Sequence, residues 1–362
     1  MSLSLTKIDK NEYKYNRSSS IEYDKLCSII SSKYGNNKCI VTPSGMSAID
    51  LVFNSIYVEN KWKSINIIYS WELYYETPLL FEYYKKIYTN MDLTLYEVPI
   101  TSNIYDNERI IDLFENKVRN EINIFYVESC SNMSGWFFDI DIITQIRKLS
   151  KKLYFIIDNT WLTSTIFNPF VYDVDITVLS LSKHYSGGHC ISGALICKNI
   201  DYYEIAKTNY TIKGYHVSTH VCTTILDNMN QMKERLIKTS NIANDVAKYL
   251  KKQKQILEVS YPLFENHASY RLRNKYFKLI IDGKIIGPDV FSFAIDENEN
   301  VLIKKLKNMN ILNLKTSYGG GDSRIESTPI EIGNTTWCRI SIGYNDDYEK
   351  IIKGLNEILV PF

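Results

Sequence analysis

Five short apolar runs in the first half of this 362-residue chain limit the folds that it can adopt. The runs are Cys39–Thr42, Ile65–Tyr69, Asn123–Val127, Leu153–Ile157 and Ile176–Leu181. Polar or glycine-containing turns follow several of them, and helical patterns separate some, as at Ile142, Ile143, Ile146 and Leu149. Strands that alternate with helices predict an α/β fold whose mainly parallel sheet carries helices on both faces.

The pattern changes in the second half of the chain. Apolar residues that share one helical face predict a long helix over residues 224–252. These residues are Met229, Met232, Leu236, Ala243, Val246 and Leu250. After Tyr261-Pro262 the sequence becomes a mixture of strand and helix patterns. We therefore expect an N-terminal arm and first helix over 1–36, a large domain over 37–228 and a smaller C-terminal α+β domain over 229–362.

Composition excludes several classes of protein. The chain is 45% hydrophobic and 23% charged, which is typical of a globular protein. Its net charge of +1 gives no reason to expect nucleic acid or an acidic membrane as a partner. No CxxC pair occurs among the seven cysteines, and the N-terminus lacks the apolar stretch of a signal peptide. We expect a cytoplasmic protein with no membrane span and no metal site.

Two ionisable residues follow buried strands in a pattern that suits cofactor chemistry. Asp158 comes directly after the run Leu153–Ile157, and Lys183 lies in a turn after the next predicted strand. Both should lie at the carboxyl edge of the sheet, where functional residues collect. Partial burial lowers the pKa of a lysine and leaves a nucleophilic amine. From spacing alone, a helix-capping Asp158 and a surface Lys183 are the favoured interpretation.

Sequence motifs around these two residues resemble the cystathionine γ-synthase and γ-lyase family of pyridoxal-phosphate (PLP) enzymes. Asp158-Asn159-Thr160 is similar to the family's DNT, and SLSKHYSGGH over 180–189 is similar to its S-A-T-K-Y-x-G-G-H. The resemblance implies that Lys183 forms the Schiff base with PLP and that Asp158 holds the ring nitrogen protonated. It also implies that the hydroxyls of Ser180 and Ser182 bind the cofactor phosphate.

Three further N-terminal motifs match in the same order. PSGMSA over 43–48 resembles the family's S-G-M-A-A turn, in which Gly45 and Met46 would offer backbone N–H groups to the phosphate. Tyr15-Asn16-Arg17 resembles its Y-S-R, so Tyr15 and Arg17 would reach the phosphate of a neighbouring subunit. LYYET over 73–77 resembles its Y-G-G-T, so Tyr74 would stack on the PLP ring and assist proton transfer.

Matches continue to Gly343. Glu128 and Asn132 resemble the E-x-P-x-N-P segment, which would place Asn132 beside the phenolic oxygen of the ring. TSYGGGDS over 316–323 resembles S-L-G-G-x-E-S and implies that Thr316 and Ser317 lie beside the substrate. WCRISIG over 337–343 resembles L-I-R-L-S-V-G and implies that Arg339 binds the substrate carboxylate, a task that suits a planar guanidinium.

The chain departs from the family at positions that would surround the substrate. Tyr75 and Glu76 replace residues that are usually small, and Met133 replaces the usual proline. Thr316 matches neither the glutamate of γ-acting members, the tyrosine of β-lyases nor the small residue of methionine γ-lyases. These departures indicate an unusual substrate acted on by the family's cofactor chemistry.

The resemblance implies PLP fold type I, the aspartate-aminotransferase-like fold, and a homotetramer built from dimers that share active sites. It implies γ-replacement or γ-elimination on a small-molecule amino acid with a γ-leaving group. A β-lyase would use the same catalytic residues and remains an alternative. A non-catalytic PLP-binding protein is a second alternative, which the intact Lys183, Asp158, Tyr74 and Arg339 disfavour.

Overall fold

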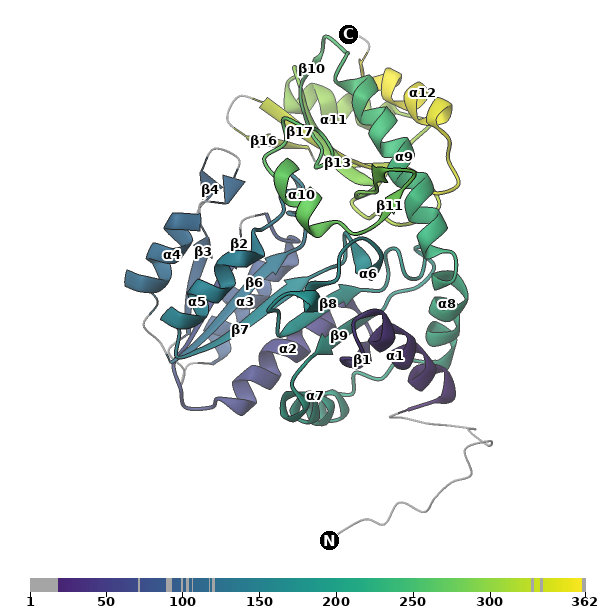
Figure 1. The fold of residues 1–362 in the computed structure, drawn as a ribbon. Coiled ribbons are helices and arrows are strands. Elements are labelled where there is room, and N and C mark those ends of the chain that lie inside the picture. Colours follow the sequence, from purple (N-terminus) through teal and green to yellow (C-terminus); the bar gives the residue numbers. More distant parts are fainter. Residues whose placement is uncertain are drawn as a thin grey trace.

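The computed structural model consists of two parts, each of which is a β-sheet with helices packed against it. It describes residues 19–70, 72–88, 93–98, 100–101, 104–105, 107–116, 118, 121–326, 329–332 and 335–359. Figure 1 shows a large sheet with its helices below a smaller sheet that contains the C-terminal strands. The two parts have separate hydrophobic cores, and a long helix, α9 (Met232–Leu250), runs along both.

The large sheet has the mainly parallel topology that the apolar runs predicted. Its strand order is β1 (Lys38–Thr42), β9 (Gly193–Cys197), β8 (Ile176–Ser180), β7 (Lys152–Asp158), β6 (Ile122–Glu128), β2 (Ile65–Ser70) and β3 (Leu93–Val98). The pairings from β8 through β3 are parallel, whereas β9 runs antiparallel to both β1 and β8. All five predicted runs are strands, and β3 and β9 are additional.

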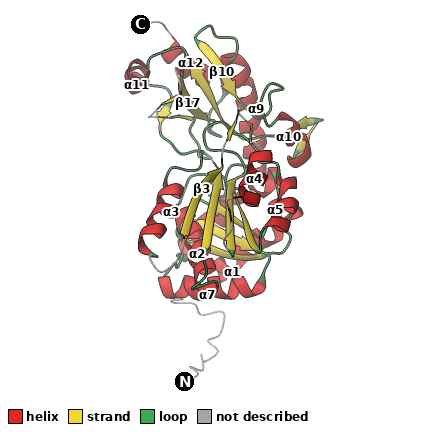
Figure 2. Cartoon of the chain, turned by 90° about the vertical axis from the view of Figure 1, so that its left-hand side faces the viewer, coloured by secondary structure: helices red, strands yellow, loops and turns green. Residues whose placement is uncertain are grey.

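Helices cover both faces of this sheet, as Figure 2 shows for α3 and α5 on opposite sides. They are α1 (Ile21–Lys33), α2 (Gly45–Glu59), α3 (Glu76–Ile87), α4 (Asn107–Asn116), α5 (Ile143–Leu149), α6 (Thr163–Ile166), α7 (Ile200–Lys213) and α8 (Thr219–Met229). Short 3-10 turns, η1 (Ile140–Ile142) and η2 (Pro169–Val171), precede α5 and follow α6. Among the described helices, none is long and apolar enough to cross a membrane.

The prediction of one long helix over 224–252 was wrong. Helix α8 ends at Met229 and α9 begins at Met232, because the backbone of Gln231 (φ −97°, ψ 4°) leaves the helical region and its N–H donates to the carbonyl of Asn228. The asparagines at 228 and 230 are poor helix formers, so the break falls at a locally weak point. The apolar period alone did not reveal this break, since the apolar residues of α8 before it and of α9 after it are both buried in a core.

Buried side chains of α9 change core partway along the helix. Leu236 belongs to the core of the large domain, whereas Ala243 belongs to the C-terminal core. The segment around α10 (Tyr270–Tyr276) also joins the large core, where the ring of Tyr276 stacks on Phe137 with centroids 4.9 Å apart. The domain boundary near residue 228 therefore stays a prediction. Segments after that residue, in α9 and around α10, contribute side chains to the core of the large domain.

The C-terminal sheet is built around β17 (Thr335–Ser341). Its order is β10 (Ile256–Ser260), β13 (Val290–Ile295), β17, β15 (Arg324–Ile325) and β14 (Asn313–Leu314), and β16 (Ile330–Ile332) also pairs with β17. Helices α9, α11 (Glu299–Asn308) and α12 (Tyr348–Leu359) pack against it. Two small hairpins complete the described elements, namely β4 (Ile100–Thr101) with β5 (Ile104–Tyr105) and β11 (Ile280–Ile281) with β12 (Lys284–Ile285).

Truncation of a ring inside the large sheet should weaken the fold. Phe155 on β7 is fully buried, and its ring stacks on Phe125 at 5.6 Å. Phe155→Ala leaves a cavity on the sheet face beside the Phe125 ring and should cost about 3–5 kcal/mol. The urea midpoint, followed by circular dichroism, should fall clearly. Ile212→Ala, at a side chain that is 77% exposed, is the control and should leave the midpoint unchanged.

Candidate active site

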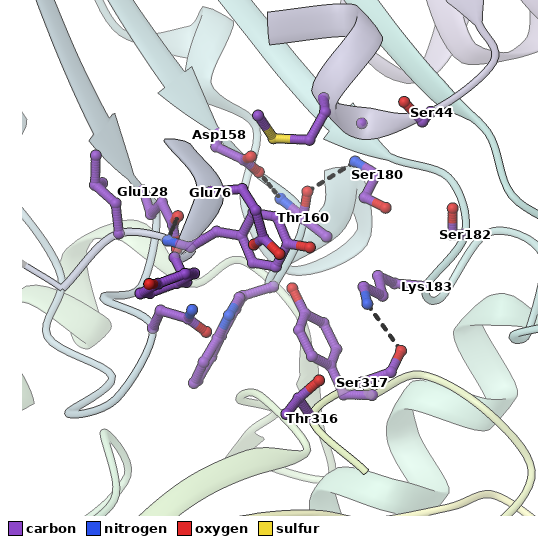
Figure 3. A pocket seen from close by; sticks show the side chains of 18 of the residues that line it. Ser44, Glu76, Glu128, Asp158, Thr160, Ser180, Ser182, Lys183, Thr316 and Ser317 are labelled. Carbon is purple, nitrogen blue, oxygen red and sulfur yellow. Dashed lines mark hydrogen bonds between the residues drawn. The ribbon is translucent and has the colours of Figure 1, made fainter. Parts of the chain in front are cut away.

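A cavity of about 1020 Å³ lies between the carboxyl edge of the large sheet and the C-terminal sheet. Figure 3 shows its side chains pointing into one space from both parts of the molecule. Every predicted site residue within the described part of the chain lines it: Gly45, Met46, Tyr74, Asn132, Asp158, Ser180, Ser182, Lys183, Thr316, Ser317 and Arg339. Tyr15 and Arg17 lie outside the described residues.

Two buried carboxyl groups end neighbouring strands at the floor of this cavity. Glu128 and Asp158 are the last residues of β6 and β7 and lie in direct register. Asp158 accepts hydrogen bonds from the Thr160 N–H at 2.9 Å and from the Tyr126 hydroxyl at 3.3 Å. Burial raises the pKa of Asp158, and within the described residues no basic side chain forms an ion pair with it. A cation placed beside it would relieve this desolvation.

Glu128 is held in a different way. Its carboxylate accepts the backbone N–H of Tyr74 at 2.5 Å, which fixes the turn before α3. Burial, and then the neighbouring charge of Asp158, raise the pKa of Glu128 well above its usual range. Burial thus raises the pKa of both carboxyl groups at these strand ends, and the charge of each one disfavours ionisation of the other.

An anion cradle lies at the start of α2. The helix begins at Gly45, and Ser44 caps it by accepting the N–H of Ser47 at 3.0 Å. The first N–H groups of a helix have no partner within it, so those of Gly45 and Met46 are available to an anion. Ser180, at the end of β8, lies next to Gly45, since a Cβ on that glycine would be 3.4 Å from the Ser180 hydroxyl. Strand β9 passes so close that a Cβ on Gly193 would lie 2.2 Å from the carbonyl oxygen of Ser44. This glycine is required for the cradle to form.

Lys183 lies between the cradle and the C-terminal sheet. Its turn follows β8, and its Nζ donates a hydrogen bond to the Ser317 hydroxyl at 2.8 Å. The ring of Tyr318 lies 5.1 Å from the same nitrogen. Burial, with the charges of Arg339 and Arg324, lowers the pKa of Lys183 to about 8, although Asp158 opposes the shift. About a tenth of this amine is therefore neutral and nucleophilic at pH 7, far more than for a lysine with an ordinary pKa.

A glycine allows the C-terminal turn to reach this lysine. Gly319 has φ +74°, and a Cβ there would lie 2.7 Å from the amide nitrogen of His184. His184 is itself buried, 3.6 Å from the buried carboxylate of Asp289. The segment that carries Ser317 can approach the lysine turn only because both steric and conformational demands at 319 are met by glycine.

Arg339 on β17 faces the cavity with its guanidinium held by the protein. It donates to the carbonyl and side-chain oxygens of Asn132, to the Thr316 carbonyl at 2.5 Å and to Glu326 at 3.1 Å. Arg339 and Glu326 are both about nine-tenths buried, so their ion pair keeps this end of the cavity electrically balanced. The sequence had placed Arg339 here but gave no sign of Glu326.

Tyr74 and the two unusual residues after it form one rim of the cavity. Burial and the nearby carboxylate of Glu76 raise the pKa of Tyr74, so its hydroxyl stays protonated and can donate. Tyr75 is 73% exposed and Glu76 is exposed at the start of α3. The two departures from the family therefore leave room for a cofactor, and they add an apolar ring and a charge at the entrance.

Glu72 is a site residue that sequence reasoning missed. Its backbone has φ +57°, and its carboxylate accepts from the Ser131 and Ser134 hydroxyls and the Ser134 N–H at 2.8–2.9 Å. Its carbonyl also accepts the N–H of Asn132 at 2.7 Å. Together these bonds shape the loop that presents Asn132. The residues are about 60 positions apart, so no local pattern could have indicated the contact.

These features fit a pyridine ring with a phosphate at one end. The anion cradle, the reactive lysine and the buried carboxylate of Asp158 line one cavity. Among the described residues that carboxylate has no ion-pair partner, and a protonated ring nitrogen would supply one. The model of the family described as "Cys/Met metabolism PLP-dependent enzyme" matches residues 3–346. The chain belongs to that family, and the protein is therefore a PLP-dependent enzyme of fold type I.

Individual relatives differ in the reaction that they catalyse. An L-alanine/L-glutamate racemase of Wolbachia pipientis is 25% identical over 66% of this chain and 58% of its own length. A cystathionine β-lyase of Schizosaccharomyces pombe is 26% identical over 88% of this chain and 76% of its own. A cystathionine γ-synthase structure from Xanthomonas oryzae pv. oryzae superposes with a TM-score of 0.81 at 18% identity, covering 99% of this chain and 90% of that one.

The pKa of Lys183 predicts how cofactor uptake depends on pH. Because the pKa of Lys183 is lowered to about 8, the fraction of neutral amine should increase as the pH is raised through 8. The rate at which the cofactor-free protein takes up PLP should rise with that fraction and then level off. Visible absorbance measures the rate, and borohydride reduction followed by peptide mapping should locate the adduct on Lys183. In Arg339→Met the midpoint should move upward. A midpoint near pH 10 would contradict a desolvated amine.

Proposed function

We propose that this enzyme catalyses γ-replacement or γ-elimination on an amino acid with a γ-leaving group, as cystathionine γ-synthases and γ-lyases do. The observation that carries the proposal is the amine of Lys183, lowered to a pKa of about 8 in a cavity that also contains Asp158 and Arg339. Its relatives include both synthases and lyases of this family.

We assign substrate orientation to Arg339. Asn132, Thr316 and Glu326 hold this guanidinium in a fixed plane, and a substrate carboxylate would replace one or more of these acceptors to form the two parallel hydrogen bonds that a guanidinium makes with a carboxylate. The α-carboxylate of the substrate would therefore be fixed at the C-terminal wall, with its α-carbon toward Lys183. Thr316 contributes its carbonyl to this arrangement, so its side chain is free to determine what lies beside the substrate.

Lys183 acts as the base in this proposal. Its amine is partly neutral near pH 7, and Ser317 accepts one of its protons in a hydrogen bond that fixes its direction. A lysine side chain is long enough to take the α-proton and then a β-proton of a substrate held by Arg339. The Tyr74 hydroxyl, whose raised pKa keeps it protonated, donates a proton on the entrance side.

Bound PLP supplies an electron sink next to the substrate α-carbon. We propose that Asp158 keeps the ring nitrogen protonated, and that Gly45, Met46, Ser180 and Ser182 hold the phosphate. Burial without an ion-pair partner in the described part of the chain suits Asp158 to this role. Asn132 would contact the ring's phenolic oxygen from the loop that Glu72 shapes.

Products from cystathionine separate γ-elimination from β-elimination. With water, γ-elimination yields cysteine, 2-oxobutanoate and ammonia, whereas β-elimination yields homocysteine, pyruvate and ammonia. We expect the first set, or formation of cystathionine from an O-acylated homoserine and cysteine. The cavity volume of about 1020 Å³ leaves room for a substrate of this length beside the cofactor in either reaction, so the products decide between them. Homocysteine with pyruvate would favour the β-lyase alternative. Neither product set from cystathionine, together with no cystathionine formed from an O-acylated homoserine and cysteine, would refute both.

We further propose a cytoplasmic homotetramer of dimers that share active sites. All seven cysteines are free thiols, which suits a reducing compartment. An apolar stripe is exposed along α3 at the cavity rim, where a second copy of the chain would cover it. It consists of Tyr75, Leu79, Tyr83 and Ile87, which are 73%, 51%, 56% and 45% exposed.

Subunit complementation tests the shared site. Lys183→Ala should be inactive, and Arg17→Ala should be weakened because each site would lose the arginine of its neighbour. When the two variants are unfolded together and refolded as a mixture, mixed dimers should regain one intact site with Lys183 from one chain and Arg17 from the other. Recovered activity measures this. Activity no higher than that of the Arg17→Ala fraction alone would mean that Arg17 acts within its own chain.

A further inference from the structure

His184, the residue after Lys183, faces a buried carboxylate from the other part of the molecule. It belongs to the lysine turn of the large domain, whereas Asp289 comes immediately before β13 of the C-terminal sheet. Their side chains are only 4% and 3% exposed, and Nε2 of His184 lies 3.6 Å from Oδ1 of Asp289. Two ionisable side chains this deeply buried are costly unless each one satisfies the other.

The two atoms that face each other need a common proton. Within the described residues, neither Nε2 of His184 nor Oδ1 of Asp289 forms a hydrogen bond. Burial lowers the pKa of His184 and raises the pKa of Asp289, so each group resists carrying a charge alone. One proton between them would satisfy both atoms, and their separation exceeds an ordinary hydrogen-bond distance by only about half an ångström.

Other charged and titratable groups reach His184 from three elements. Lys183 precedes it in the turn, and the guanidinium of Arg235 on α9 donates to its carbonyl at 2.9 Å. These positive charges oppose protonation of the histidine, whereas the carboxylate of Asp289 favours it. The ring of Tyr318 covers a further side, and burial raises the pKa of its hydroxyl, which therefore stays neutral. A proton on Nε2 is thus stabilised from the side of Asp289.

The backbone that carries Asp289 is anchored. The Tyr261 hydroxyl, which stays protonated because burial raises its pKa, donates to the Pro288 carbonyl at 3.1 Å. Ile342 donates its N–H to the Asp289 carbonyl at 2.9 Å. The carboxylate therefore projects from a fixed corner of the C-terminal sheet, and a hydrogen bond to His184 would hold the lysine turn against that corner.

Tyr318 connects the position of His184 to the reactive amine. Its ring packs on the His184 ring with centroids 5.6 Å apart, and Nζ of Lys183 lies 5.1 Å from the centroid of the same ring. The preceding residue, Ser317, accepts a hydrogen bond from that amine (Figure 3). If the lysine turn moved away from Asp289, the amine would lose both contacts and water would reach it.

We propose that His184 and Asp289 form a hydrogen-bonded pair that joins the lysine turn to the C-terminal sheet and thereby positions the amine of Lys183. Neither side chain lines the cavity, so both are positioning residues that act through Tyr318 and the backbone of the turn. The proposal rests on the function proposed above, in which the desolvated amine binds PLP and acts as the base.

Two substitutions at 289 separate position from charge. Asp289→Asn keeps an acceptor for the histidine, whereas Asp289→Leu does not, and both remove the same negative charge. The pH midpoint of PLP uptake, expected near 8 in wild type, should rise by at least about one unit in Asp289→Leu and in His184→Phe, because the amine becomes hydrated. Uptake at pH 7 should then slow about tenfold. Asp289→Asn should keep the wild-type midpoint. A downward shift of both variants at 289 would mean that charge alone acts, and would overturn the proposal.

Urea midpoints separate positioning from stability. They should fall in His184→Phe and Asp289→Leu, each of which leaves one buried polar group unpaired, and recover in the double variant, where both groups are apolar. The pH midpoint of the double variant should stay raised, because an apolar contact has no fixed direction. His267→Phe removes another buried histidine, whose Nε2 lies 3.0 Å from the Ser134 carbonyl oxygen. This control should lower the urea midpoint and leave the pH midpoint unchanged.

The pair can fail independently of the function on which it rests. If wild type takes up no PLP, that function is wrong, and the pH midpoint for reductive methylation of Lys183 by formaldehyde, read by peptide mapping, provides the same comparison among the variants. A wild-type midpoint in both single variants, or its return in the double variant, would make the pair a purely structural contact and overturn the proposal.

Discussion

The turn at 316–319 lies directly against the peptide that joins Lys183 to His184, and this contact brings the two cores together at the reactive amine. It places the Ser317 hydroxyl 2.8 Å from Nζ of Lys183 and the Tyr318 ring over the same nitrogen. It also removes the amine from water, which is the first cause of its lowered pKa. Without this contact Lys183 would be a solvated lysine with an ordinary pKa and little reactivity as a base or nucleophile.

The distribution of charge in the cavity also depends on the contact between the two parts, because both of them contribute charged groups to its lining. The large sheet contributes two carboxyl groups at the ends of β6 and β7, and the C-terminal sheet contributes two guanidinium groups on one face. Glu326 forms an ion pair with Arg339. The cavity therefore offers a carboxylate to a cationic ring and guanidinium groups to anionic substituents, with a partly neutral amine between them. A zwitterionic substrate held on a PLP ring is complementary to this distribution.

Local motifs predicted much of the site because each describes a single turn. The sequence shows where strands end and where helices start, and these points determine the positions of three site residues. Asp158 ends one buried strand, Lys183 follows the next, and Gly45 begins a helix. Glu72, Glu326 and Arg324 were missed, since their importance depends on residues far away in the chain. The break at Asn230-Gln231 was missed because the apolar period continues across it.

The amino-acid sequence by itself determined the α/β class, the strands of the large sheet and the residues able to carry PLP chemistry, because hydrophobic periodicity and turn motifs are local properties. Only the tertiary structure decided that Arg339 pairs with Glu326, that Arg324 forms no ion pair among the described residues, that Glu128 and Asp158 adjoin, and that Lys183 is desolvated. Each of those depends on which strand lies beside which, and on how closely glycines at 193, 319 and 320 let separate segments approach. Burial and charge in the cavity are therefore properties of the assembled sheets, which no single segment contains.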